Sequence, residues 1–300
     1  MIYQVRHITS YHYLEPVSMC HNLLHLRPRI CRDQRCIQTR VQVEPMPRQV
    51  HEHQDYFGNP VSAFSIQNPH KVMTIVAEHL VERKQSEGQD VPDMPWEQAR
   101  EILRSDKSPH NLEAYQFTFP SRYVPLGEEL AQYACESFQP GRPMIQAALE
   151  LNQRIFQEFK YDPQATTIST PIRDVLANRK GVCQDFAHLM IGCLRSVGLA
   201  ARYVSGYLLT TPPPGKEKLV GADATHAWLS AYLPGHGWVD FDPTNNLVPS
   251  DKHITLAWGR DYDDISPIKG VILGGGSHSM KVEVTMTPSS LHSEETPSVS

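Results

Sequence analysis

A cysteine, a histidine and an aspartate follow one another along this chain, each where the residue pattern predicts the end of a helix or strand. Cys183 comes after a glycine-marked turn and before an apolar helical run. His226 enters a predicted strand, and Asp242 closes the next one, just before Pro243. A thiolate paired with a histidine base can attack a carbonyl carbon and form a covalent acyl intermediate. An acid that orients the imidazole would complete such a site.

The position of Cys183 at a predicted helix N-terminus favours a nucleophile over an ordinary core cysteine. The first N–H groups of a helix lack intrahelical partners, so they can stabilise a thiolate or an oxyanion. Polar Gln184 and Asp185 follow Cys183, and the apolar stripe of the helix begins only at Phe186. Cys193 lies on that stripe, and we interpret it as a packed thiol.

Two aspartates compete for the third position of the site. His226 shares a strand face with Trp228, and it would act first as general base and then as general acid. Asp240 and Asp242 have the same parity on the following strand, so Asp240 is the alternative partner. An aspartate before Pro243 is also a common turn initiator.

The hairpin between these strands must have a particular register if His226 and Asp242 are to share a face. A loop with an even number of residues would place them on opposite faces, because a slip of one residue inverts a strand. We therefore predict an odd-length loop or a β-bulge near Gly235–Gly237, with Tyr232 opposite Trp238.

Four runs of residues resemble a known family. They are Gly181-Val182-Cys183-Gln184-Asp185-Phe186-Ala187-His188, Arg202-Tyr203-Val204-Ser205-Gly206-Tyr207, Thr225-His226-Ala227-Trp228 and Asp242-Pro243-Thr244-Asn245. In these runs the chain resembles the transglutaminase-like superfamily, specifically its bacterial branch of candidate cysteine proteases. The resemblance is strong over about residues 150–250 and weaker in the N-terminal region and at Gly259–Tyr262.

The resemblance implies an α+β fold with a papain-like, transglutaminase-like core, in which a helix packs on an antiparallel sheet. A small β-sandwich domain would precede this core. The resemblance favours Cys183, His226 and Asp242 as the catalytic triad, and it assigns no role to Asp223. The implied activity is cleavage of an amide or peptide bond in a peptide or protein through a thioester, by a protease or amidase.

Two other functions stay open at this point. One is a protein-glutamine transamidase, and the other is a non-catalytic binding module that keeps the fold. Animal transglutaminases carry calcium sites and extra β-domains, but this chain has no EF-hand loop, and Asp261–Asp264 is too short a signal for calcium. We therefore expect no cofactor and no metal.

The chain divides into four predicted regions. Residues 1–82 are predicted to form the short strands of a β-sandwich, because apolar and polar residues alternate in segments such as Ile37–Val43. Residues 83–145 form a helical linker region, 146–287 the catalytic core, and 288–300 a disordered Ser/Thr/Pro/Glu-rich tail. Predicted helices cover residues 96–103, 127–138 and 143–159, and predicted strands cover 202–208, 225–233, 238–242 and 282–286.

The helix after Cys183 shows the clearest periodicity in the chain. Its apolar residues recur at helical spacing: Phe186, Leu189, Met190, Cys193, Leu194 and Val197. Gly198 is the expected C-terminal cap, and His188 is read as a structural or surface residue. A polar stretch at 86–95 is expected to be a linker. The loop at 211–223 is either a rim or lid of the site or a solvated connection.

The composition of the chain limits the classes of partner that we expect it to bind. The 300 residues carry a net charge of −5 and are 40% hydrophobic. Nucleic acid is therefore an unexpected partner, and no apolar run approaches the roughly 18–20 residues of a membrane span. The polar start of the chain does not resemble a signal peptide, so we expect a cytoplasmic protein whose oligomeric state stays open.

The cysteines and histidines outside the triad give no strong signal. The six cysteines should be free thiols in a reducing compartment. His51 and His53, and the loose group of His7, His12, His21 and His25, are interpreted as solvent-facing strand histidines, since no zinc-type spacing accompanies them.

Overall fold

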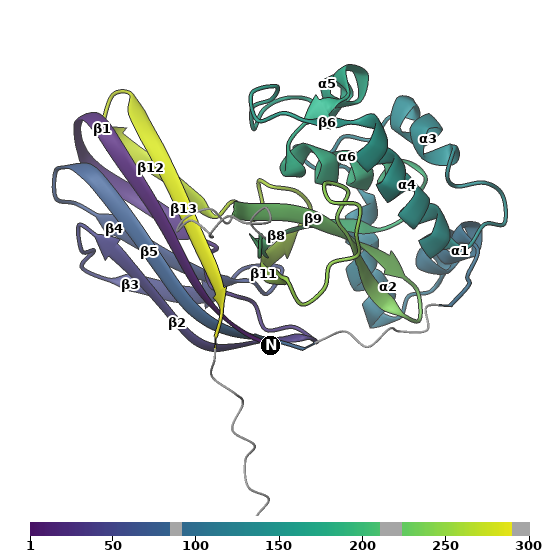
Figure 1. Cartoon of the computed structure of the whole chain (residues 1–300), viewed down its shortest axis with the longest axis horizontal. Coiled ribbons are helices and arrows are strands. Elements are labelled where there is room, and N and C mark those ends of the chain that lie inside the picture. Colours follow the sequence, from purple (N-terminus) through teal and green to yellow (C-terminus); the bar gives the residue numbers. More distant parts are fainter. Residues whose placement is uncertain (85–91, 211–223, 290–300) are drawn as a thin grey trace, which may run out of the picture.

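The computed structural model describes residues 1–84, 92–210 and 224–289, and it arranges them in two main sheets (Figure 1). The strands of the seven-stranded sheet are β1 (Ile2–Leu24), β2 (Gln34–Glu44), β3 (Val50–Gln54), β4 (Pro60–Ile66), β5 (His70–Arg83), β12 (Ile268–Gly274) and β13 (His278–Pro288). The four-stranded sheet is antiparallel, in the order β10 (Gly237–Phe241), β9 (Ala224–Leu233), β8 (Ala201–Leu208) and β11 (His253–Gly259). A short parallel pair consists of β6 (Lys160–Tyr161) and β7 (Lys180–Gly181).

The long strand β1 joins two halves of the seven-stranded sheet. Its first half pairs with β5 and β13, and its second half pairs with β4 and β12. The register of β1 against β5 shifts between His12 and Val17, where one half gives way to the other. Residues of β1, β4 and β5, among them Phe64 and Ile75, share one buried cluster. The N-terminal region is therefore rich in strands, as expected, and its two halves enclose a common core.

The C-terminal strands belong to the N-terminal sheet. We expected residues up to 287 to lie with the catalytic core, but β12 and β13 both pair with β1. Val284 and Met286 on β13 are completely buried beside Tyr3 and Val5 of β1. Alternation of apolar residues predicts a strand, but it does not say which sheet the strand joins.

The helices cover the four-stranded sheet (Figure 1). They are α1 (Trp96–Ser105), α2 (Pro109–Tyr115), α3 (Glu128–Cys135), α4 (Met144–Glu158), α5 (Ile172–Asn178) and α6 (Cys183–Ser196), with a 3-10 turn η1 (Gln116–Thr118). Our predictions for α1, α3, α4 and α6 are confirmed. Helices α2 and α5 were not predicted, because they have seven residues each and so show only about two turns of periodicity.

Helix α6 forms the centre of the hydrophobic core beside the four-stranded sheet. All six residues of its predicted apolar stripe lie in one buried cluster with residues of α1, α3, α4, β8 and β9. The helix ends as predicted at Gly198, whose φ of 85° suits glycine. Gly198 N–H donates to Arg195 O at 2.9 Å, and Leu199 N–H donates to Leu194 O at 3.0 Å. These two bonds form a Schellman cap.

Side chains from the N-terminal region pair with the outer edge of β11. The Gln34 amide donates to Thr255 O at 2.7 Å and accepts the Thr255 N–H at 2.8 Å. The Asn59 amide makes the same two bonds to Trp258, at 2.8 and 2.9 Å. These amides replace a neighbouring strand, so the N-terminal region fixes the position of β11 in the core.

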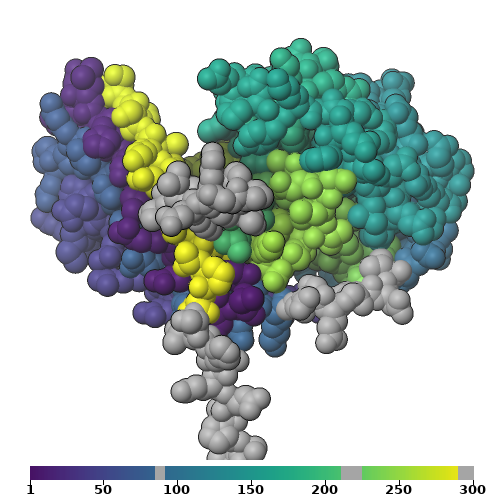
Figure 2. Space-filling model, viewed as in Figure 1, coloured from purple at the N-terminus to yellow at the C-terminus, as the bar shows by residue number. Residues whose placement is uncertain are grey.

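A notch separates the two parts of the molecule on one face. In Figure 2 it opens between the β13 side of the N-terminal sheet and the helices around α5. Among the described residues, no helix is both long and apolar enough to cross a membrane. Most of the predicted linker, the loop at 211–223 and most of the C-terminal tail lie outside the described residues.

Candidate active site

Cys183 is the first residue of α6, and the turn that precedes it is tightly built. Asp185 Oδ2 accepts the Val182 N–H at 2.8 Å and the Thr166 hydroxyl at 2.6 Å. Burial raises the pKa of Asp185, and these two hydrogen bonds oppose that effect. A Cβ on Gly181 would lie 2.8 Å from the Asp185 Cβ, so glycine is needed there. Cys183 itself is partly exposed, as a nucleophile must be.

His226 lies on β9 beside a large aromatic residue. The Trp228 ring stacks near the imidazole, with centroids 6.1 Å apart. Gly206 stands opposite His226 on β8. A Cβ on Gly206 would lie 2.0 Å from Ile254 O and 2.5 Å from the Trp228 ring, so only glycine leaves room for this tryptophan.

The imidazole of His226 contacts both Asp242 and Cys183. Its Nε2 lies 2.7 Å from Asp242 Oδ2, and the two side chains are 6% and 0% exposed. The thiol of Cys183 lies close enough to the ring to influence its titration. Burial would lower the pKa of His226, but the hydrogen bond to Asp242 and the neighbouring Cys183 raise it to about 10. Burial would raise the pKa of Asp242, but hydrogen bonds from His226 and then His253 hold it well below its ordinary value.

The hairpin has the register that this contact requires. Gly237 pairs with Leu233, so three residues close the loop, and Trp238 pairs with Tyr232. Gly235 and Gly237 have φ values of 78° and 106°. The predicted odd-length loop and the predicted cross-strand pair are both confirmed.

Asp242 both starts a turn and faces His226. Its Oδ1 accepts the N–H groups of Thr244 and Asn245 at 3.0 and 3.2 Å, which is the turn-initiating role expected before a proline. Its Oδ2 is left for the imidazole. The two interpretations of this aspartate are thus compatible, because each uses a different oxygen.

Asp240 is engaged elsewhere. Its Oδ1 accepts the Ser230 hydroxyl at 2.5 Å, and its Oδ2 accepts the Trp228 indole N–H at 3.3 Å. The structure therefore brings Cys183, His226 and Asp242 together and leaves Asp240 beside them. Asp223 lies outside the described residues.

Two further residues contact the carboxylate of Asp242. The Asn245 amide lies 2.7 Å from Oδ2 and 3.3 Å from His226 Nε2. His253 Nε2 lies 3.2 Å from the same oxygen, and this ring is 2% exposed. Asn245 belongs to a run that indicated the site, but no local pattern distinguishes His253 among the fifteen histidines.

The group of His226, Asp242 and His253 also invites a metal interpretation. Their ligand atoms lie within 4.8 Å of one another, and imidazole and carboxylate are ordinary zinc ligands. The Asn245 amide argues against an ion, since it directs a donor at the same oxygen from 2.7 Å. A hydrogen-bond network explains the arrangement better than a cation does.

The other predicted roles of cysteines and histidines are partly confirmed. Cys193 is completely buried, and burial raises the pKa of its thiol. His188 is structural, since its Nε2 accepts the Tyr262 N–H at 3.1 Å. His7 and His25 are buried, contrary to our prediction of solvent-facing residues. The side chain of His7 bonds to Tyr207 of the other sheet, and burial lowers its pKa to about 4.

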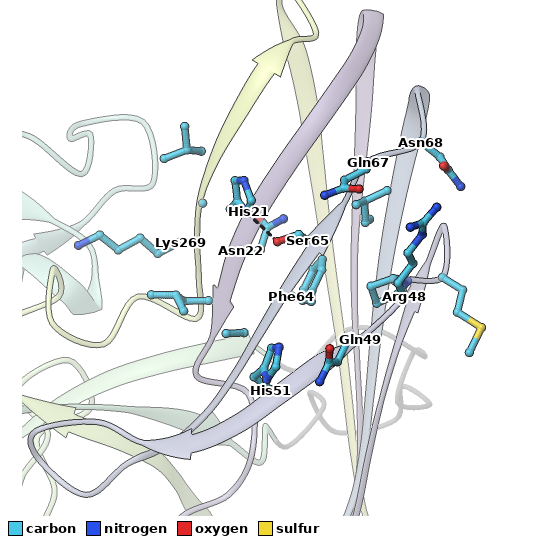
Figure 3. Close-up of a pocket in the computed structure, with 17 residues that line it drawn as sticks. His21, Asn22, Arg48, Gln49, His51, Phe64, Ser65, Gln67, Asn68 and Lys269 are labelled. Atoms are coloured by element: carbon cyan, nitrogen blue, oxygen red, sulfur yellow. Dashed lines mark hydrogen bonds between the residues drawn. The ribbon is translucent and has the colours of Figure 1, made fainter.

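A separate hollow of about 670 Å³ lies in the N-terminal sheet (Figure 3). Residues of β1, β3, β4 and β12 line it, among them His21, Phe64 and Lys269. Lys269 already bonds to the Asp263 carboxylate at 3.0 Å. Cys183, His226 and Asp242 do not line this hollow.

Comparison with known proteins agrees with the geometry. Residues 131–243 match the transglutaminase-like superfamily, and residues 3–82 match the bacterial transglutaminase-like N-terminal region. An uncharacterized protein of Mycobacterium tuberculosis is 38% identical over 291 residues, which cover 95% of this chain and 92% of that protein. The protein-glutamine gamma-glutamyltransferase of Pseudomonas aeruginosa is 34% identical over 103 residues, 32% of this chain and 15% of that protein.

A solved structure shares the whole fold. A candidate cysteine protease from Cytophaga hutchinsonii superposes with a TM-score of 0.73 at 22% identity, over 97% of this chain and 92% of that one. The predicted α+β fold, with a transglutaminase-like core and a strand-rich N-terminal region, is confirmed.

Proposed function

Since the chain belongs to the transglutaminase-like superfamily, we propose that it is a cysteine-dependent acyl-transfer enzyme that cleaves an amide or peptide bond. One observation carries the proposal: the buried Asp242 carboxylate lies 2.7 Å from the imidazole of His226, whose pKa is raised by Asp242 and by Cys183 at the start of α6. A scaffold without activity has no need for a completely buried carboxylate aimed at a histidine beside a thiol. The Cys183 sulfur would be the nucleophile, His226 the acid and base, and Asp242 the residue that orients and charges the imidazole.

In the first half of the reaction, the Cys183 sulfur forms a bond to the carbonyl carbon of the amide. The carbonyl electrons move to oxygen, and the free N–H groups at the start of α6 stabilise that oxyanion. The carbon–nitrogen bond then breaks as the His226 imidazolium gives its proton to the departing amine. A thioester on Cys183 and a neutral His226 remain.

In the second half, neutral His226 takes a proton from water while the water oxygen bonds to the thioester carbon. The carbon–sulfur bond breaks, and the product acid and the Cys183 thiolate are released. The thiolate and the His226 imidazolium are then restored as a pair. Asp242 favours this state because its negative charge faces the imidazolium.

Water is the acceptor that we favour, which makes the enzyme a protease or an amidase. The reaction with water needs no second substrate site. Transamidation is the second candidate, and the similarity to the Pseudomonas aeruginosa protein-glutamine gamma-glutamyltransferase supports it. In that case an amine replaces water in the second half, and the same three residues serve both reactions.

The two activities can be separated in one experiment. The protein is incubated with a peptide library that contains glutamine, with and without a biotinylated primary amine, and the products are identified by mass spectrometry. Shortened peptides or deamidated glutamine indicate hydrolysis, whereas biotin on glutamine indicates transamidation. The Cys183→Ala variant is the control. A product pattern that is the same with this variant, or no acyl-enzyme with any peptide, contradicts the proposal.

A further inference from the structure

His253, the first residue of β11, contacts the carboxylate of Asp242 from a strand that carries none of the other site residues. Its ring is 2% exposed, and its Nε2 lies 3.2 Å from Asp242 Oδ2. The Trp228 ring meets the His253 ring edge to face, with centroids 5.2 Å apart. The His226 and His253 rings lie 5.9 Å apart. His253 is therefore packed among the groups of the site and is not a bystander on the surface.

The surroundings of the two ring nitrogens determine the tautomer of His253. Nδ1 is buried and has no hydrogen-bond partner among the residues that the structure describes. A proton on Nδ1 alone would leave a buried donor unpaired and would turn the Nε2 lone pair toward the carboxylate, which is unfavourable twice over. The ring that carries its proton on Nε2 instead donates to Asp242. The missing partner at Nδ1 thus fixes the direction of the bond at Nε2.

The orientation of the Asp242 carboxylate depends on its hydrogen-bond donors, and His226 is only one of them. Backbone N–H groups hold Oδ1, and Oδ2 receives His226, Asn245 and His253 at 2.7, 2.7 and 3.2 Å. Asn245 belongs to the same turn as Asp242, so it moves with that turn. His253 comes from a different strand, which Gln34 fixes from outside through Thr255. It ties the aspartate to β11, the edge strand on the far side of the sheet from β10.

We propose that His253 is a positioning residue of this site, whose Nε2–H holds the Asp242 carboxylate facing His226 when the imidazole is charged. The proposal rests on the proposed thiol chemistry, since it supports the thiolate–imidazolium pair. It adds a residue to the site that reaches the reacting atoms only through Asp242 and His226. It also links the N-terminal sheet to the reaction, because that sheet fixes β11.

The test is the pH profile of Cys183 alkylation by iodoacetamide, followed by mass spectrometry on the full chain. His253→Phe keeps the ring and removes the donor. At pH 6 we expect it to lower the alkylation rate constant of Cys183 by about tenfold, since a charged group loses a hydrogen bond. His253→Gln places an amide N–H near the former Nε2, and it should restore the rate to within about threefold of wild type.

A matched control excludes a general effect of replacing a buried histidine. His70 also has a buried nitrogen, Nε2, without a partner in the described part of the chain, but its Nδ1 bonds to Asn68 O in the N-terminal sheet. His70→Phe should keep the wild-type profile. If His253→Phe does not fold, His253→Met removes the donor with a more adaptable side chain and carries the same expectation.

The outcomes separate this proposal from the proposed function. If His253→Phe and His253→Met both keep the wild-type profile, or if His253→Gln fails to restore it, the positioning role is overturned and the thiol chemistry stands. If wild-type Cys183 reacts at pH 6 no faster than the exposed Cys135, the proposed function is overturned, and the positioning role falls with it.

Discussion

His226 Nε2 and Asp242 Oδ2 lie 2.7 Å apart although sixteen residues separate them, and a three-residue hairpin loop makes this contact possible. The odd loop length gives the two strands an even pairing sum, so Asp242 leaves β10 on the face that His226 occupies on β9. The acid is completely buried, so water does not weaken the ion pair. The orientation of the candidate base thus depends on a turn at the far end of the hairpin.

The first prediction compares the two aspartates of this strand. Asp242→Asn keeps the shape and removes the charge, so it should lower amide turnover by roughly 10²–10⁴-fold. Asp240→Asn is the matched control, because Asp240 bonds to Ser230 and Trp228 and should affect turnover by less than about tenfold. Steady-state rates of the wild type and both variants on one peptide substrate test this prediction. An equal loss in both variants would remove the distinction between the two aspartates.

The second prediction concerns thiol reactivity. Cys183 should react with iodoacetamide at pH 6 faster than exposed Cys135, because the adjacent imidazolium stabilises the thiolate. Cys193 should not react in the folded protein, since it is completely buried and burial raises its pKa. Peptide mapping after a short exposure gives all three rates. Labelling of Cys193 as fast as that of Cys183 would contradict the assignment.

Much of this site could be predicted from the sequence because its signals are local. The start of α6 at Cys183, the stripe from Phe186 to Val197 and the cap at Gly198 all follow from spacing along one helix. The hairpin register followed from one geometric requirement, that His226 and Asp242 share a face. In each case the residues that decide the structure stand close together in the chain.

The contacts that escaped prediction all depend on pairing between distant segments. His253 meets Asp242 only because β11 pairs with β8 and is fixed from outside by Gln34. Likewise, the residue pattern predicts a strand at β13 but does not predict that it joins β1. In the pair Tyr3↔Pro288 the two residues stand 285 positions apart (288 − 3). Periodicity reports which face of a strand is buried, and it carries no information about which neighbour buries it.

The third prediction tests the space beside His226. Gly206→Ala should destabilise the fold by about 2–4 kcal/mol, because its Cβ would overlap Ile254 O and the Trp228 ring. Gly192→Ala on α6 is the matched control, since its nearest neighbour is a flexible Leu130 side-chain atom at 3.1 Å. There the helix propensity of alanine should offset the tight contact to within about 1 kcal/mol. Urea unfolding compares the two variants, and equal losses would mean that the space at Gly206 is not critical.

The fourth prediction concerns metal removal. If His226, Asp242 and His253 form a hydrogen-bond network, dialysis against EDTA should leave both the turnover and the Cys183 alkylation profile unchanged. Adding zinc back to the dialysed protein should increase neither the turnover nor the alkylation rate of Cys183. A loss of activity on dialysis that zinc restores would show that the three residues hold an ion.

The last prediction is a pH dependence of stability that arises from His226. Its pKa is raised from 6.5 to about 10, so the folded state binds this proton more tightly than the unfolded state does. The stabilisation is therefore complete below about pH 6.5 and is lost as the pH rises toward about 10. His226→Gln lacks the titrating group, and urea unfolding of both proteins at pH 6, 8 and 10 isolates its contribution. The stability advantage of the wild type should shrink by at most about 1.4 kcal/mol per pH unit. Cys183→Ala should weaken the trend, because the thiolate contributes to the raised pKa. A wild-type advantage that stays constant from pH 6 to 10 would mean that folding does not raise the pKa of His226, and the stabilising contact with Asp242 and Cys183 would then not favour the charged imidazole.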